Sequence, residues 1–177
     1  MPNFDYEIIR VKLNNAGITI AMTIRGDYSP EDYSVVFADP IKLEVYMKEV
    51  NRGYDPVGLQ SKVAAANRGI LQAAILPETT DALHTLPMAK VNCLILHGKA
   101  QVSFSDGMTR TTQLLFLGAE FVPLEVSSKE AELLHKLVGN GKATVPAADF
   151  IIPSDVRIAR MTEYYVNSRK KGVKYEP

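Results

Sequence analysis

Residues 91–121 read VNCLILHGKAQVSFSDGMTRTTQLLFLGAEF, and this stretch decides the expected fold. It contains the only cysteine of the chain, Cys93, and one of the three histidines, His97. An apolar run is followed by a polar segment with the turn sequence SDG, and then by a second apolar run. Because Asp and Gly favour turns, the pattern predicts two paired strands with Asp106 and Gly107 at the hairpin tip. We expect these strands at the centre of the core, and the exposed tip as a candidate contact to a partner.

The residues before this stretch predict a hairpin and a third strand. Ile18 to Ile24 alternates apolar side chains with small ones, which is typical of a half-buried strand. Phe4 to Leu13 alternates partially, and the intervening Asn14 to Gly17 is rich in residues that tolerate turns. The two segments therefore predict a hairpin with a loop of about four residues. The β-branched and aromatic residues 33–37 indicate the third strand.

Two Asp-Pro pairs indicate helix starts, because Asp caps a helix and Pro fits its first position. The first pair, at 39–40, predicts a helix over 40–51, with a strand over the same residues as the alternative. The second pair, at 55–56, predicts the clearest helix of the chain. It runs over 57–76, where apolar residues recur at three- and four-residue steps.

The residues after the opening stretch predict one strand and two helices. Residues 119–126 have the pattern of a strand, and Pro123 confines that strand to a sheet edge. Ser127 followed by Glu130 fits a capping box, which predicts a helix that the later Gly-Asn-Gly sequence ends. An extended segment broken by prolines follows, and then a last helix over 154–171.

Together these elements predict an α+β fold, with a mainly antiparallel sheet covered by two to four helices. The length of 177 residues suits a single domain over residues 1–177. In chain order we expect a hairpin plus third strand, a helical part, the central strands, and helices with an extended segment between them. The ranges of these parts are 1–38, 39–76, 91–126 and 127–171.

The composition argues against several classes of protein. Lys plus Arg equals Asp plus Glu, at 20 each, whereas a dedicated nucleic-acid-binding protein usually shows a basic excess. The single Cys cannot form an internal disulfide and fits a reducing compartment. No apolar run approaches the roughly 20 residues that a membrane helix needs, and the N-terminus lacks the pattern of a signal peptide. We expect a soluble protein without a membrane partner, cytoplasmic where it is made.

Cys93 and His97 are candidates for a thiol–imidazole pair, or for a small-ligand site near them. On a strand they would share a face but lie about 13 Å apart, which is too far for proton transfer. Only on a helix would the two residues be neighbours. The apolar residues around Cys93 favour a buried, unreactive thiol. The three histidines show no ligand spacing, and one Cys cannot build a structural zinc site. We therefore assign no catalytic, cofactor-binding or metal-binding residue.

Two other segments match binding motifs only in part. The sequence GNGKAT at 139–144 lacks the spacing of a phosphate loop, and it follows a predicted helix, so it indicates a helix end. Acidic residues gather around Asp27, where a solvated loop is favoured over a cation or acid–base site.

The C-terminal segment is basic and aromatic, and is a candidate contact to single-stranded nucleic acid or to a protein partner. Basic side chains bind a phosphate backbone, and Tyr rings can stack on bases. The favoured alternative is a packed helix with a solvated basic tail, because the chain has no net charge. The candidate residues are Arg157, Arg160, Tyr164, Tyr165, Arg169, Lys170 and Lys171.

Since these motifs fail on spacing, the sequence argues against an enzyme. We expect a non-enzymatic structural or interaction subunit of a homo-oligomer or larger assembly, of which a viral particle is one example. The expected partners are copies of the chain itself and other proteins, and the assembled particle would be a second location. The alternatives are a single-stranded nucleic-acid-binding protein that uses the C-terminal segment, and a small-ligand-binding protein or enzyme with a site near Cys93 and His97.

Overall fold

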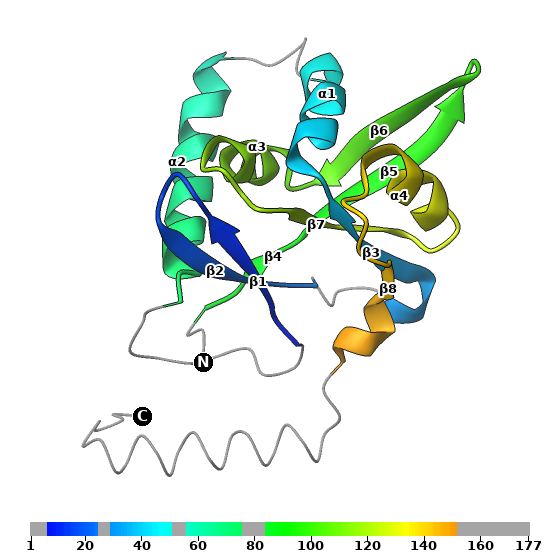
Figure 1. The fold of residues 1–177 in the computed structure, drawn as a ribbon. Helices are drawn as coiled ribbons and strands as arrows, with labels where there is room; N and C mark the ends of the chain where they lie inside the picture. The colour runs from blue at the N-terminus through cyan, green and yellow to red at the C-terminus, as the bar shows by residue number, and fades with distance from the viewer. Residues whose placement is uncertain (1–6, 25–28, 51–55, 76–83, 152–177) are drawn as a thin grey trace.

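The computed structural model of the chain describes residues 7–24, 29–50, 56–75 and 84–151 (Figure 1). These residues form two β-sheets and four α-helices, so the fold is α+β, as the sequence predicts. Most of the strand pairs are antiparallel. The helices are α1 (Pro40–Val50), α2 (Pro56–Gln72), α3 (Met108–Phe116) and α4 (Ala131–Val138). The predicted C-terminal helix and the loop at Asp27 lie outside the described residues.

A three-stranded sheet has the order β1-β2-β4. Strands β1 (Ile9–Leu13) and β2 (Ile18–Thr23) pair antiparallel across the predicted four-residue turn, and β4 (Leu86–Pro87) runs parallel to β2. The predicted hairpin is confirmed. The end of α2 is tied to this sheet, because the Ala21 amide donates to the Ala73 carbonyl at 2.9 Å.

A five-stranded sheet has the order β6-β5-β7-β3-β8. Its strands are β3 (Tyr33–Ala38), β5 (Ala89–Leu96), β6 (Lys99–Asp106), β7 (Val122–Ser127) and β8 (Val145–Pro146). The central strand is β7, and β6 lies at the edge, so the prediction that residues 91–121 supply the central strand pair was wrong. The short helix η3 (Ala147–Phe150) follows β8.

The second apolar run of the opening stretch is a helix, which corrects the predicted strand. Asp106 and Gly107 are therefore not a hairpin tip: they join the end of β6 to the start of α3. The real turn lies nine residues earlier, at His97 and Gly98, between β5 and β6. Both turn residues have a positive φ, 50° and 76°, which is the signature of a two-residue hairpin turn of type I′.

Pro123 lies in the central strand rather than at a sheet edge, which corrects a second prediction. On one side β7 pairs with β3 along its whole length, and Pro123 is opposite Phe37. On the other side β7 pairs with β5 only at Leu124 and Glu125. The missing N–H of Pro123 therefore costs no ladder hydrogen bond to β5, which explains why proline is tolerated there.

The predicted N-terminal cap is present in α1 but not in α4. Asp39 caps α1 as predicted: its Oδ1 accepts from the amides of Ile41, at 2.9 Å, and Lys42, at 3.1 Å. Residues 40–50 are helix, so the alternative strand is excluded. The predicted capping box of α4 is wrong, since Glu130 does not reach back to cap its own helix. The helix ends at Gly139, as expected for GNGKAT.

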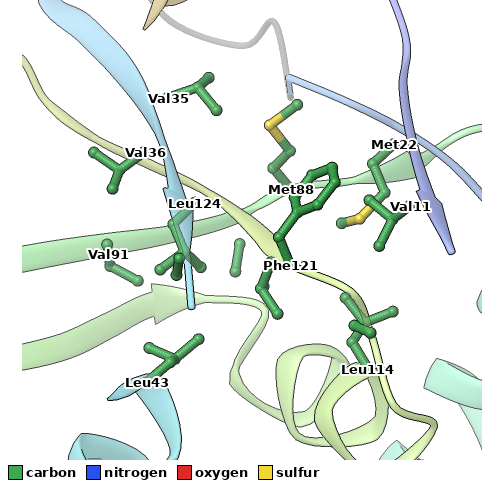
Figure 2. Close-up of a cluster of buried hydrophobic side chains, with 14 of the residues drawn as sticks. Val11, Met22, Val35, Val36, Leu43, Met88, Val91, Leu114, Phe121 and Leu124 are labelled. Atoms are coloured by element: carbon green, nitrogen blue, oxygen red, sulfur yellow. The ribbon is translucent and has the colours of Figure 1, made fainter. Parts of the chain in front are cut away.

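The core lies between the five-stranded sheet and helices α1, α3 and α4, and it extends to the three-stranded sheet. Figure 2 shows Leu43 of α1 pointing toward Leu124 of β7, with Leu114 of α3 and Met22 of β2 at the far side of the cluster. All four side chains are buried. This core fixes the base of β5 and β6, from which the two strands extend outward (Figure 1).

Candidate functional site on the arm of β5 and β6

The outer part of the β5–β6 hairpin projects beyond the core (Figure 1). We call residues 94–101 the arm. Cys93 and Val102, which oppose each other at its base, are 1% and 3% exposed. The next residues along β5 are Leu94, Ile95 and Leu96, which are 47%, 62% and 46% exposed. Three consecutive apolar side chains therefore lie in solvent on a structured strand, a pattern that marks contact surfaces more often than isolated exposed apolar residues do.

The arm also presents part of an open strand edge. Strand β7 pairs with β5 only at Ala89 and Lys90, and then diverges. The amide of Cys93 points away from β6, because it donates to Oε2 of Glu130 at 2.7 Å. Residues two apart on a strand point the same way, so the N–H and C=O of Ile95 also face away from β6. Such an edge is a template for another strand.

Glu130 limits this open edge. Its carboxylate occupies the position at which the carbonyl of a neighbouring strand would accept from Cys93. At the other end, the left-handed turn at His97 and Gly98 stops the extended conformation. The available edge is therefore Leu94 to Leu96, with Ile95 at its middle.

Cys93 does not have the properties of a nucleophile. Burial raises the pKa of its thiol from 9.0 to about 11, and the nearby carboxylate of Glu130 adds to this effect. A neutral thiol is a poor nucleophile, since the thiolate is the reactive form. His97 lies at the exposed tip of the arm, so the structure does not bring the two side chains together in one site. The prediction that the thiol is buried is confirmed, and its lack of reactivity stays a prediction.

Asp106 and Gly107 are placed at the inner end of β6, on the side of the sheet that faces α3. Asp106 Oδ2 accepts from Nη2 of Arg110 at 3.1 Å. The same guanidinium donates to the Met88 carbonyl at 3.3 Å. The ion pair of Asp106 and Arg110 therefore stabilises the junction between β6 and α3.

A second group of polar residues on the sheet was missed by the sequence analysis. Glu125 of β7 is completely buried, and it is the direct neighbour of Lys90 on β5 and Val35 on β3, so the three side chains share a face. The Nζ of Lys90 lies 4.1 Å from the ring centroid of Tyr33 on the same face. The available signal was the single charge in the apolar run FVPLEV, because a buried carboxylate is costly and marks functional sites.

The remaining predicted site residues, from Arg157 to Lys171, lie outside the described part of the chain. Among the residues that the structure does describe, no group of three His, Cys, Asp or Glu side chains is placed to hold a metal ion. In the same residues, no helix is long and apolar enough to cross a membrane.

Comparisons with known proteins identify the family. The sequence model described as PFIN: Plasmid Fertility inhibition factor matches residues 44–139, which is more than half of the chain. The chain belongs to this plasmid fertility inhibition factor family. The matched residues of the chain include the whole arm, β7 and Glu130. A search of curated proteins finds no match.

A solved structure shares the fold of this chain. It is the crystal structure of the Oncogenic Suppression Activity Protein, described as a plasmid fertility inhibition factor, in its gold(I) cyanide derivative. The two chains are 17% identical with a TM-score of 0.61, and the alignment covers 88% of this chain and 77% of that one. The likeness therefore extends beyond residues 44–139 to most of the chain.

Proposed function

We propose that this protein lowers the transfer of a plasmid that shares its cell, and that it does so by protein–protein contact in which the arm takes part. The observation that carries the proposal is membership of the fertility inhibition factor family over residues 44–139. The exposed apolar residues of the arm lie within the matched residues and support action by contact.

The proposal keeps the expectation of an interaction protein. It does not keep the viral particle, because the family is described by an effect on plasmids. Nucleic-acid binding by the basic C-terminal segment stays a prediction, and the salt dependence of affinity for a single strand would test it.

The test is a mating assay in which donor cells carry a transmissible plasmid with or without this chain. We expect fewer transconjugants per donor when the chain is produced. In donors that make Ile95→Lys or Leu96→Lys, transfer should return toward the level without the chain. Phe116→Lys is the matched control, because Phe116 is 75% exposed on α3 and lies outside the arm. Unchanged transfer in the presence of the wild-type chain would refute the function, and full inhibition by both arm variants would refute the role of the arm.

The buried Glu125 favours a second candidate function, chemistry or small-ligand binding on the face that Glu125 shares with Lys90. This candidate moves the site from Cys93 and His97 to the sheet centre. Glu125→Gln keeps the size and shape of the side chain but removes its charge. Loss of inhibition in this folded variant, with inhibition intact in Ile95→Lys, would favour the second candidate over the arm.

A further inference from the structure

We propose that two copies of this chain pair through their arms, edge to edge, about a two-fold axis at Ile95. The inference does not rest on the proposed function, because it concerns the purified protein alone. It starts from the short open edge at Leu94 to Leu96, which Glu130 bounds on one side and the turn at His97 bounds on the other.

The length of the edge fixes the register. A long edge would admit several alignments of a second strand, but here only Ile95 directs its backbone groups away from β6 within the open segment. In an antiparallel pair centred on Ile95, each Ile95 amide donates to the Ile95 carbonyl of the second copy. The five-stranded sheets of the two copies then become continuous.

The side chains agree with this register. Leu94 and Leu96 lie on one face of the strand. Antiparallel pairing places Leu94 of one copy beside Leu96 of the second copy, and Leu96 beside Leu94. Four half-exposed leucine side chains would then cover one another, while the two Ile95 side chains meet on the opposite face. Burying such apolar area contributes about 25 cal/mol per Å².

Charge complementarity favours a second copy over an unrelated strand. Residues 91–105 include His97 and Lys99 but no Asp or Glu. The pairing centred on Ile95 brings His97 opposite Cys93 of the second copy, where the Glu130 carboxylate is held. The basic tip of each copy therefore lies near the Glu130 carboxylate of the other copy, and the two-fold symmetry gives this contact twice. An unrelated strand would have to supply both the acidic and the basic group itself.

The first experiment measures the mass of the full-length chain in solution by sedimentation equilibrium over a concentration series. We expect a reversible monomer–dimer equilibrium that shifts to monomer in Ile95→Lys and in Leu96→Lys. Phe116→Lys is expected to dimerise like the wild type. A wild-type chain that is monomeric throughout, or a dimer that both arm variants leave intact, would overturn the proposal.

The second experiment tests the register by disulfide trapping in a Cys93→Ala background. Hydrogen-bonded residues opposite each other in an antiparallel pair have Cα atoms about 5.5 Å apart, which suits a disulfide. Under mild oxidation we expect Ile95→Cys to form covalent dimers. Leu94→Cys and Phe116→Cys are the controls, since neither would face itself across the axis. Equal trapping at all three positions would contradict the two-fold axis at Ile95. A chain that dimerises as expected but leaves plasmid transfer unchanged would refute only the proposed function.

Discussion

Cys93 is a residue whose burial has a measurable consequence for stability. Burial, with a smaller effect of the Glu130 carboxylate, raises the pKa of its thiol from the ordinary 9.0 to about 11 in the folded chain. Between these two values the unfolded state binds fewer protons than the folded state, so the free energy of unfolding falls as the pH rises from about 9 to about 11. Denaturant unfolding of wild type and Cys93→Ala over this pH range checks the prediction. The Ala variant should lose less stability with pH, and parallel curves would contradict it.

Gly107 is a second residue at which the fold restricts the side chain. It has a φ of 83°, and a Cβ placed there would lie 2.8 Å from the Cα of Ala89. Gly98 is the matched control, because its φ is 76° but no atom lies within 4 Å of such a Cβ. We expect Gly98→Ala to cost about 1–2 kcal/mol for the left-handed conformation alone, and Gly107→Ala to cost more. Thermal unfolding of both variants provides the comparison, and equal losses would show that the contact with Ala89 is unimportant.

At the residue scale, the sequence predicts contacts that form between near neighbours. The cap of α1 by Asp39 could be predicted because donor and acceptor lie within three residues of each other. Glu130 was assigned to its own helix by the same reasoning, but its carboxylate bonds to Cys93, 37 residues away. No local pattern indicates such a partner.

Helices and strands also depend on contacts between residues that are distant in the sequence, and α3 is the clearest case. Its sequence MTRTTQLLF contains three β-branched threonines, which favour a strand. The segment is nevertheless a helix, because Gly107 turns the chain at the end of β6 and Leu114 then packs into the core. Strand order is also non-local: nothing in residues 122–127 shows that β7 is the centre of the sheet. The arm could not be predicted for this reason, since its exposure depends on where β7 diverges from β5.

The hydrogen bond from the Cys93 amide to Glu130 connects the edge of β5 to the start of α4. Glu130→Ala removes the acceptor for the Cys93 amide, and we expect a loss of about 1–2 kcal/mol in the free energy of unfolding. Glu130→Gln keeps an acceptor oxygen and should lose less. Hydrogen exchange at the Cys93 amide, followed by NMR, should accelerate in the Ala variant and much less in the Gln variant. Similar protection in both would mean that the carboxylate does not hold this edge.

In the molecule as a whole, the core that stabilises the fold and the arm that forms the candidate site are separate parts of the structure. The buried side chains of both sheets and of the helices form one core, and Cys93 and Val102 mark where that core stops along β5 and β6. The arm beyond them contributes little to the core, and its exposed apolar residues are where we propose contact with another chain. This separation permits a test in which the arm is removed and the fold is kept.

The last prediction concerns a chain in which Asn-Gly replaces residues 95–100. Leu94 and Gln101 would then flank a two-residue turn, and they form the same type of strand pair as Leu96 and Lys99 around the natural turn. Because the deleted residues lie outside the core, we expect the free energy of unfolding to change by less than about 1 kcal/mol. The chain should be monomeric by sedimentation and should no longer lower plasmid transfer. Unfolding of this variant would show that the arm belongs to the core. A folded variant that still dimerises and inhibits transfer would exclude the arm from both roles.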